Sequence, residues 1–591
     1  MVPEPAFRRI SLGPADVRVE RDAAGRFLLR HTAPLGPSPR RLTDRLLHWA
    51  EEAPRRSFVA KRGSGGGWRR IGYAEALAAA RSIGEALLAR GLSAERPLMI
   101  LSENDLEHAM LALAALHVGV PYVPVSPAYS LVSRDYGRLR YVADLMTPGL
   151  VYAADERYAP AVEAAVRPGT EVLWGRDFAA LAATPAGTRV DAAHEAIGPE
   201  TISKFLLTSG STGMPKAVIH TQRMLTSNQQ MIVECLPFLA EEPPVLVDWL
   251  PWNHTFGGSH NFGLTLYNGG TLYIDEGKPT PQLIGETLRN LREVAPTVYF
   301  NVPRGFEELA RALDADPALA GSFFSRLKMM FYAAASLSQP IWDGLHRIAE
   351  RTVGERILMI TGLGMTETSP FAVCANWEAG RSGGIGLPAP GLELRLAPVA
   401  DKLEVRYRGP NVTPGFWRAE SLTLAAYDED GFYRSGDAAC FIEADDPRKG
   451  LAFDGRIAED FKLDTGTWVS AGPLRARIIA AGDPYVQDAV ITGHDRAEVG
   501  ALIIPRAGVP DTPETRRFFQ GLIDMLALEA SSSSTRIARA MLLTAPLSID
   551  AGEITDKGSI NQRAVLKARS ALVEQLYATP QSPGVILPST R

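Results

Sequence analysis

Cysteine is rare in this 591-residue chain, and neither a long apolar run nor a secretory signal is visible; each of these observations argues against a class of protein. The three cysteines, Cys235, Cys374 and Cys440, lie far apart without a CxxC or Cys/His neighbourhood, so neither a disulfide framework nor a zinc site is indicated. No apolar run reaches membrane-spanning length. The first residues show no apolar segment of a signal peptide. We expect a cytoplasmic protein that makes no use of a membrane.

An excess of positive charge is also missing. The net charge is -5 and the isoelectric point is about 6.1, which argues against a general nucleic-acid binder. Lysine is scarce, with ten among 62 basic residues. Because arginine is the usual surface cation of this chain, a retained lysine indicates a place where a compact, movable charge is needed.

The length and the patterning predict more than one domain. Alternating strand and helix patterns in the first half, such as a helix over 73–91 and a buried strand in "RPLMILSEN", favour α/β layers around a mainly parallel sheet. Short β-like pieces from about 380 to 455 predict a smaller, β-barrel-like unit. After about residue 460 a smaller α+β domain is expected, in which the serine run at 531–534 precedes and caps a helix.

One stretch, "FLLTSGSTGMPKAVIHT" at 205–221, places hydroxyls and glycines between two apolar, strand-like runs. A flexible linker is seldom flanked in this way. The Walker phosphate loop also fails, because the spacing is Gly210-x-x-Gly213-x-x-Lys216 and Ala217 stands where Ser or Thr is required. The composition still suits phosphate, since glycines admit backbone N–H groups, hydroxyls donate and Lys216 adds a point charge.

This stretch resembles the phosphate loop of the adenylate-forming superfamily, which includes acyl- and aryl-CoA synthetases, luciferases and peptide-synthetase adenylation domains. Six more motifs resemble those of the family and follow in its order: "LPWNHTFGG" (250–258), "YAAAS" (332–336), "GLGMTETSP" (362–370), "YRSGDAA" (433–439), "DGRIAEDFKL" (454–463) and "GEITDKGSINQRAVL" (552–566). The resemblance extends over roughly residues 40 to 570, and it rests on the ordered set rather than on any single motif.

The resemblance implies a nucleotide site. Phosphate would be held by Thr208, Ser209, Gly210, Ser211, Thr212, Gly213 and Lys216, and the remaining nucleotide contacts would come from Ala333, Ala334, Gly362, Leu363, Gly364, Met365, Asp437, Arg456 and Lys462. Thr366 would touch phosphate and Glu367 would hold Mg²⁺, while Asp437 would accept from the ribose hydroxyls. Leu363 departs from the family, in which an aromatic residue usually stacks on adenine.

The family's adenylation lysine is matched less directly. Aligned on Ile560, that lysine falls on Ser559, and Lys557 lies two residues earlier. We choose Lys557, with Ser559 and Lys462 as the positions to examine if it is wrong. Glu459 occupies the hinge position of the family. The implied domains are an adenylation domain over 1–458, with the acyl pocket, and a mobile domain over 459–591 that contains the lysine and shapes the coenzyme A channel.

The acyl pocket implied by the family has His254 at its mouth. Its expected walls are Phe256, Gly257, Tyr299, Phe300, Tyr332 and Ala335, with gaps at Gly362 and Gly364. Aromatic walls with glycine gaps suit a flat aryl acid better than a flexible chain. The combination of "GLGMTETSP", "GRIAEDFKLDTGTWVS" and "GEITDKGSINQRAVL" is most similar to bacterial feruloyl-CoA synthetases. This similarity implies ATP-dependent ligation of coenzyme A to ferulate and related hydroxycinnamates in the catabolism of lignin aromatics.

The implied partners are ATP, Mg²⁺, coenzyme A and an aryl acid, with the protein a monomer or a homodimer. Several alternatives stay open. The acid could be of the benzoate type or a medium-chain acid. An enzyme that loads a carrier protein is a further alternative, although "GGSH" at 257–260 has the wrong order for a carrier site. A luciferase-like oxygenase and a nucleotide-binding regulator without activity are the remaining alternatives.

Overall fold

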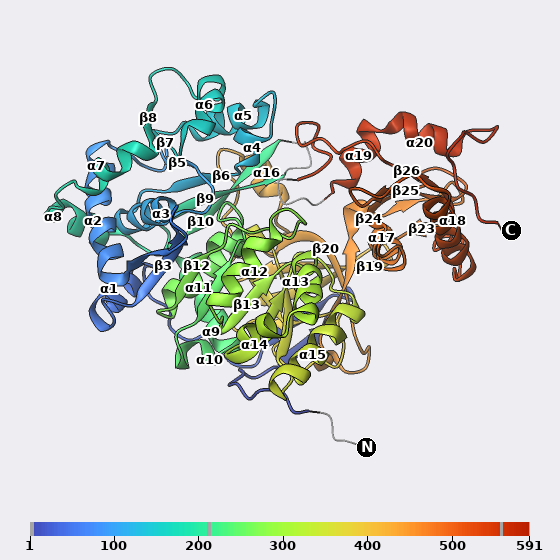
Figure 1. The fold of residues 1–591 in the computed structure, drawn as a ribbon, viewed down its shortest axis with the longest axis horizontal. Coiled ribbons are helices and arrows are strands. Elements are labelled where there is room, and N and C mark those ends of the chain that lie inside the picture. Colours follow the sequence, from blue (N-terminus) through green and yellow to red (C-terminus); the bar gives the residue numbers. More distant parts are fainter. Residues whose placement is uncertain (1–4, 210–213, 556–559, 590–591) are drawn as a thin grey trace.

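The computed structural model describes residues 5–209, 214–555 and 560–589. One sheet runs in the order β10-β9-β6-β5-β7-β8 (Figure 1). Its strands are β5 (Leu98–Leu101), β6 (Tyr122–Val125), β7 (Leu150–Ala153), β8 (Glu171–Trp174), β9 (Ile202–Ser209) and β10 (Pro215–Thr221). All neighbours pair in parallel except β9 and β10, which form an antiparallel pair. The predicted α/β layers with a mainly parallel sheet are confirmed.

Helices cover both faces of this sheet, which explains why its central strand is an uninterrupted apolar run. Leu98 and Ile100 of β5 belong to the core cluster formed with α2 (Tyr73–Ala89) and α3 (Leu106–Val118). Met99 and Leu101 face the other cluster, with α5 (Gly137–Met146) and α6 (Ala159–Ala165). The helix expected over 73–91 is therefore present as α2.

A second sheet runs β11-β12-β3-β4, and a third runs β1-β2-β18-β19-β20-β21-β17-β16-β15-β14-β13. The strands of the second are β3 (Ser57–Arg62), β4 (Trp68–Gly72), β11 (Val245–Asp248) and β12 (Thr271–Ile274). The strands of the third are β1 (Val17–Arg21), β2 (Phe27–His31), β13 (Val298–Asn301), β14 (Met329–Tyr332), β15 (Leu358–Gly364), β16 (Phe371–Cys374), β17 (Gly384–Pro388), β18 (Glu393–Val399), β19 (Lys402–Arg408), β20 (Tyr433–Phe441) and β21 (Leu451–Arg456). The β unit expected near 380–455 is thus continuous with the parallel strands β13, β14 and β15.

The remaining helices of this part are short to medium in length. They are α1 (Asp44–Glu52), α4 (Ala128–Leu131), α7 (Phe178–Ala182), α8 (Thr188–Ala196), α9 (Gln222–Cys235), α10 (Phe238–Glu241), α11 (Phe262–Tyr267), α12 (Ile284–Glu293), α13 (Pro303–Ala315), α14 (Pro317–Ser325), α15 (Gln339–Val353) and α16 (Glu420–Ala425).

From residue 461 onward the chain builds separate sheets, which lie to one side of the larger part in Figure 1. They consist of the pair β22 (Phe461–Lys462) and β23 (Trp468–Val469), and of the sheet β24 (Val486–Thr492), β25 (Val499–Pro505) and β26 (Ile537–Leu542). The helices are α17 (Ala471–Ala481), α18 (Pro513–Leu528), α19 (Gln562–Ala568) and α20 (Ser570–Tyr577). A large α/β part and a small α+β part were both predicted.

One local expectation about this part was wrong. The serine run at 531–534 does not cap a helix, because the next element is strand β26. Ile537 and Ala540 are buried there, and the strand pairs in parallel with β25. The short apolar run fits the hydrophobic period of a helix as well as that of a strand, and pairing with the neighbouring strand β25 decided for the strand.

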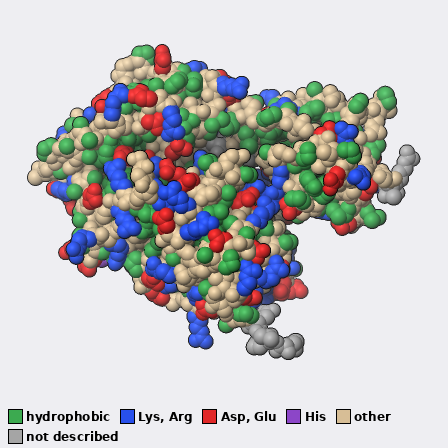
Figure 2. Space-filling model, viewed as in Figure 1, with side chains coloured by type: hydrophobic (Ala, Val, Ile, Leu, Met, Phe, Trp, Pro, Cys, Tyr) green, Lys and Arg blue, Asp and Glu red, His purple; other side chains and the backbone are tan. Residues whose placement is uncertain are grey.

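Acidic and basic side chains are interspersed on the face shown in Figure 2, as the small net charge suggests. Among the described residues, no helix combines the length and the apolar character needed to span a bilayer.

Candidate active site

The expected phosphate loop connects β9 to β10, so it stands at the tip of an antiparallel hairpin rather than between a strand and a helix. Thr208 and Lys216 are paired across this hairpin. The buried hydroxyl of Thr208 makes no hydrogen bond to any described residue. The ammonium of Lys216 lies over the ring of Phe416, 4.3 Å from its centroid. Gly210, Ser211, Thr212 and Gly213 lie outside the described residues, as does the side chain of Ser209.

Strand β15 brings the next motif to the carboxyl edge of the parallel strands, where ligands bind in open α/β sheets. A Cβ added to Gly362 would overlap the carbonyl oxygen of Val373, and one added to Gly364 would overlap that of Pro370. These glycines are therefore required for close packing of β15 on β16. Leu363 pairs with Val373 between them.

Glu367 lies in a short 3-10 helix that follows β15, and both it and Thr366 are buried. Tyr433 in β20 lies close enough to the Glu367 carboxylate to interact with it. Burial raises the pKa of Tyr433, and the charge of Glu367 raises it further. No cluster of three or more His, Cys, Asp or Glu side chains suited to a metal occurs in the described part of the chain. A single carboxylate fits Mg²⁺, which takes most of its ligands from water and nucleotide phosphates.

Asp437 in β20 and Arg456 in β21 face each other in the sheet register. Arg456 Nε lies 3.4 Å from Asp437 Oδ1. Burial raises the pKa of Asp437 to about 6, the charge of Arg456 opposes this shift, and the charges of Glu367 and Glu459 add to it. The fold therefore brings together Glu367, Asp437, Arg456 and Glu459 from three separate motifs.

Other predicted nucleotide residues are less enclosed. Ala333 is partly buried against the core, whereas Ala334 is exposed, as is Ala335, which was predicted as a wall of the acyl pocket. Met365 is partly buried between β15 and the short helix. Lys462 is exposed in β22, where its ammonium lies 4.9 Å from the centroid of the Trp468 ring.

The residue that follows the predicted hinge position makes an ion pair with the large part. Glu459 ends a short 3-10 helix, and the next residue, Asp460, is buried. Asp460 Oδ2 lies 2.7 Å from the ammonium of Lys402 in β19. Lys557 and its alternative Ser559 lie outside the described residues, so neither position is placed.

The predicted pocket aromatics divide between the two faces of the sheet. Phe300 of β13 and Phe331 of β14 lie on one face, with ring centroids 5.6 Å apart, and Phe256 packs against both. Tyr299 and Tyr332 lie on the opposite face, in a separate core cluster. Phe256 and Phe300 can line one pocket together, whereas Tyr299 packs against Phe306 and Phe323 behind it; these last two contacts are 5.8 and 5.2 Å between centroids.

His254 lies two residues before a π-helical turn, Phe256–Asn261, a feature often found at functional sites. The His254 side chain is buried, and its Nε2 lies 3.4 Å from Asn253 Nδ2. Gly257 in this turn has no space for a side chain, because an added Cβ would overlap the carbonyl oxygen of Leu250. Gly257 therefore allows two backbone segments to pack closely beside the face that bears Phe256, Phe300 and Phe331.

A buried polar chain ends at His260, in the same π-helical turn. Asn261 Nδ2 donates to Asp248 Oδ2 at 3.0 Å, so the amide oxygen of Asn261 faces His260 Nδ1, 2.9 Å away. Nδ1 must therefore bear the proton, which leaves Nε2 as an acceptor. Burial lowers the pKa of His260 to about 4, so the ring is neutral at pH 7. Nε2 is buried without a hydrogen bond to the described residues, and the ring packs against Phe300 and Phe331.

Lys204 in β9 is another buried residue behind the turn. Its ammonium donates to the carbonyl oxygen of Gly258 at 2.9 Å, and burial lowers its pKa to about 7. Sequence reasoning gave no role to Lys204, His260, Phe331 or Tyr433. Each lies inside or next to a motif, and the scarcity of lysine was a usable signal for Lys204.

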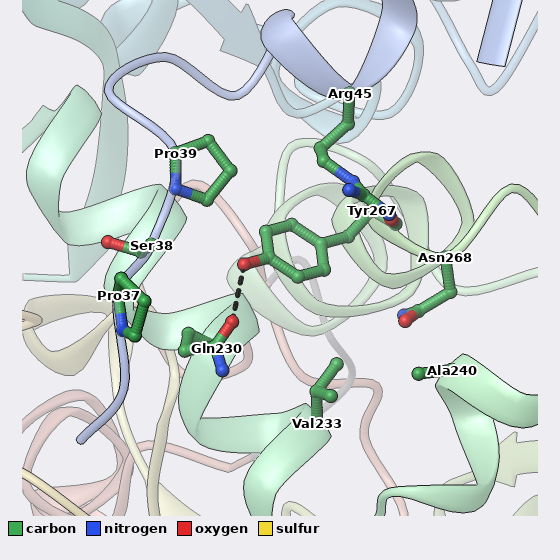
Figure 3. Close-up of a pocket in the computed structure, with 9 residues that line it drawn as sticks. All are labelled: Pro37, Ser38, Pro39, Arg45, Gln230, Val233, Ala240, Tyr267 and Asn268. Carbon is green, nitrogen blue, oxygen red and sulfur yellow. Dashed lines mark hydrogen bonds between the residues drawn. The ribbon is translucent and has the colours of Figure 1, made fainter. Parts of the chain in front are cut away.

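A cavity of about 470 Å³ lies elsewhere, between the N-terminal segment and helices α9, α10 and α11 (Figure 3). In it the Tyr267 hydroxyl donates to Gln230 Oε1 at 2.7 Å. Its lining residues are Pro37, Ser38, Pro39, Arg45, Gln230, Val233, Ala240, Tyr267 and Asn268. None of them belongs to the predicted site, so this cavity is not the candidate acyl pocket.

The geometry agrees with comparisons to known proteins. The sequence model of the AMP-binding enzyme family matches residues 46–417, and that of the AMP-binding enzyme C-terminal domain matches residues 461–581. The chain therefore belongs to the AMP-binding enzyme family. Enzymes of this family use ATP, Mg²⁺ and coenzyme A, as predicted.

Two similar curated proteins illustrate the range of acids. The 3-hydroxybenzoate–CoA ligase of Aromatoleum sp. is 25% identical over 462 residues, which cover 76% of this chain and 83% of that protein. The long-chain-fatty-acid–CoA ligase FadD15 of Mycobacterium tuberculosis is 24% identical over 585 residues, covering 87% and 93%. Neither is a feruloyl-CoA synthetase.

Two solved structures share the fold. ATP-bound MatB from Rhodopseudomonas palustris superposes with a TM-score of 0.68 at 22% identity, covering 89% of this chain and 99% of that one. The A domain of a carboxylic acid reductase from Segniliparus rugosus, in complex with AMP and a co-purified carboxylic acid, gives a TM-score of 0.71 at 19% identity, covering 91% and 94%. The fold class predicted from the sequence is confirmed.

Proposed function

We propose that this enzyme joins coenzyme A to an aromatic carboxylic acid, with ferulate and related hydroxycinnamates as the expected acids. The observation that supports an aryl acid is the aromatic face formed by Phe256, Phe300 and Phe331 around His260. This face adjoins the nucleotide motifs, because Phe331 Cζ lies 3.5 Å from the Cβ position of Gly362 in the strand that leads to Glu367. Flat apolar walls with one buried acceptor suit an aromatic ring that bears a hydroxyl group.

In the first step a carboxylate oxygen of the acid attacks the α-phosphorus of ATP, and the bond to pyrophosphate breaks. Negative charge gathers on the phosphate oxygens, so positioned cations and N–H donors dominate catalysis. Lys216 and the 208–213 loop would hold the outer phosphates, and Glu367 would hold Mg²⁺, which neutralises phosphate charge when bound. Lys557 would bridge the acid carboxylate and the α-phosphate, and Asp437 would accept from the ribose hydroxyls.

In the second step the thiolate of coenzyme A attacks the carbonyl carbon of the acyl-adenylate, and the carbon–oxygen bond to AMP breaks. We assign residues 1–458 to the adenylation domain and residues 459–591 to a mobile domain that turns about Glu459. This rotation would move Lys557 out of the site and bring a channel for coenzyme A to it. His254, at the mouth of the pocket, is the side chain we place next to the reacting carbonyl.

A benzoate-type acid is the second candidate substrate, because a 3-hydroxybenzoate–CoA ligase is among the similar proteins. Medium-chain acids are less compatible with the aromatic face. Release of AMP should be measured with ferulate, p-coumarate, caffeate, benzoate, 3-hydroxybenzoate and octanoate, each with and without coenzyme A. Turnover of octanoate alone would overturn the aryl-acid proposal, and an acyl-adenylate that accumulates and is not converted to thioester and AMP when coenzyme A is added would favour carrier loading.

A further inference from the structure

Asp550 connects the small C-terminal part to the large part by two hydrogen bonds. Ser133 Oγ donates to Asp550 Oδ1 at 2.7 Å, and the backbone N–H of Arg134 donates to Asp550 Oδ2 at 3.1 Å. Ser133 and Arg134 form the turn between α4 and α5, whereas Asp550 follows β26. Two donors on two different oxygens fix the orientation of the carboxylate as well as its position.

The receiving turn is held by its own hydrogen bonds. Ser133 is buried, its N–H donates to the carbonyl oxygen of Ala128 at 2.9 Å, and its Oγ accepts from the N–H of Tyr136 at 3.1 Å. Asp135 Oδ1 accepts from the N–H of Gly137 at 2.8 Å. These bonds all lie within the large part, so the two donors are presented whether or not Asp550 is in place.

The loop that contains Asp550 is also fixed within its own part. The Glu553 carboxylate is buried and accepts from Arg569 Nε at 2.6 Å and from the N–H of Ser548 at 2.8 Å. The N–H of Gly552 donates to the carbonyl oxygen of Ile549 at 2.9 Å. The contact therefore joins two rigid turns, and its loss would alter how the parts sit together more than how either one folds.

The contact lies beside the nucleotide motifs. Leu139 of α5 packs in the same core cluster as Phe205 of β9 and Ala217 of β10, the strands that flank the phosphate loop. On the other side, Ile554 pairs with Ile560, so the chain after Asp550 turns back on itself directly downstream of the contact. Asp550 thus connects the motif at 552–566, which contains Lys557, to the core cluster that supports strands β9 and β10 on either side of the phosphate loop.

We propose that Asp550 is a positioning residue for adenylation: its carboxylate docks the C-terminal part on the Ser133–Arg134 turn in the arrangement that forms the acyl-adenylate, and releases the turn for thioester formation. This inference rests on the proposed two-step function. Another contact between the parts joins Arg506 Nη2 to Glu307 Oε1 at 3.1 Å. Arg506 also pairs with Asp483 of its own part, and Glu307 also pairs with Arg304 and Arg311 of its own part. Asp550 is more specific than the Arg506 contact, because both of its oxygens are engaged across the interface.

The test compares the two half-reactions in the full-length enzyme. Acid-dependent exchange of pyrophosphate into ATP measures adenylation, and conversion of a synthetic acyl-adenylate with coenzyme A measures thioester formation. We expect Asp550→Ala to slow exchange 10- to 100-fold and to leave thioester formation equal or faster. Ser133→Ala should act in the same direction, and the double variant should be no worse than Asp550→Ala, because both changes break one contact.

The matched control is Asp511→Ala, since Asp511 is an exposed carboxylate of the same part that pairs with Arg516 of that part. This variant should leave both rates unchanged. Asp550→Asn, which retains one acceptor, serves if Asp550→Ala fails to fold. Unchanged exchange, or an equal loss in both half-reactions by variants with wild-type thermal stability, would overturn the proposal. If the wild-type enzyme shows no exchange with any acid, the proposed function fails instead.

Discussion

Arg456 and Asp437 form an ion pair in which only the carboxylate is largely buried, and Arg456 Nε and Asp437 Oδ1 lie 3.4 Å apart across β20 and β21. The Asp437 side chain is 12% exposed and that of Arg456 is 66% exposed. The arginine can therefore move toward a ligand, whereas the carboxylate stays at the base of the site. Its burial, together with the negative charges of Glu367 and Glu459, is what raises the pKa of Asp437 to about 6.

This pKa predicts how ATP binding depends on pH. Below about pH 6 the carboxyl of Asp437 is protonated in the free enzyme and accepts poorly from the ribose hydroxyls. We expect the KM for ATP to rise as the pH falls from 7.5 to 5.5. In Asp437→Asn the KM should be high throughout and change less with pH. Equal pH dependence in both enzymes would contradict the assignment of Asp437 to the ribose.

The same residue predicts an effect on stability. Because its pKa is raised above the unfolded value, Asp437 contributes stability that is present below pH 4 and is lost as the pH rises through 6. Asp437→Asn should therefore be more stable than the wild type at pH 7.5, by on the order of 2–3 kcal/mol. The gain should disappear near pH 4. Thermal unfolding at both pH values measures it, and a less stable variant at pH 7.5 would be the contrary result.

Lys557→Ala should separate the half-reactions. Loss of one positioned cation at the α-phosphate typically slows the step by about 10²–10³. We expect that loss in acid-dependent pyrophosphate exchange, with thioester formation from a synthetic acyl-adenylate nearly intact. Lys567→Ala, in helix α19, is the matched control and should retain both rates. An equal fall in both half-reactions would direct attention to Lys462 or Ser559.

His260 predicts selectivity for the acid. Its Nε2 is a buried acceptor without a hydrogen bond to the described residues, and the aromatic face surrounds it. We expect His260→Leu to lower kcat/KM for p-coumarate about 10- to 100-fold relative to cinnamate, which lacks the hydroxyl, because a hydroxyl then enters the pocket without an acceptor.

Tyr299→Phe is the control for that variant. Its hydroxyl accepts from Asn301 Nδ2 at 3.1 Å on the opposite face of the sheet. This change should alter stability more than selectivity. If both variants changed the p-coumarate to cinnamate ratio equally, the aromatic face would not be the acyl pocket.

The ion pair between Lys402 and Asp460, at the start of the C-terminal part, should couple the effects of substitutions at these two residues on stability. Both side chains are buried, so removing the ammonium in Lys402→Met leaves a buried carboxylate without its cation, although the N–H of Ala471 still donates to it. Such a loss typically costs about 3–5 kcal/mol. Asp460→Asn added to Lys402→Met should recover much of the loss in thermal unfolding. A purely additive double variant would show that the two groups do not interact.

Several features of the site were predictable from the sequence because they depend on local order. A glycine- and hydroxyl-rich stretch between two apolar, strand-like runs indicates a phosphate loop, and the resemblance of the ordered motifs assigns Glu367, Asp437 and Arg456 to one family site. Strand alternation also carried information that was not used. Tyr299 and Phe300 are neighbours in β13, so they could not both face one pocket.

The sequence by itself determined the layers, the two parts and the order of the motifs, because hydrophobic period and turn chemistry are properties of short segments. Only the tertiary structure decided which distant side chains meet. The approach of Tyr433 to Glu367, the chain from Asp248 to His260 and the docking of Asp550 on Ser133 each join separate elements. Such contacts depend on strand order, on which face packs inward and on how the two parts sit together, and these follow from burial of the whole core rather than from any one segment.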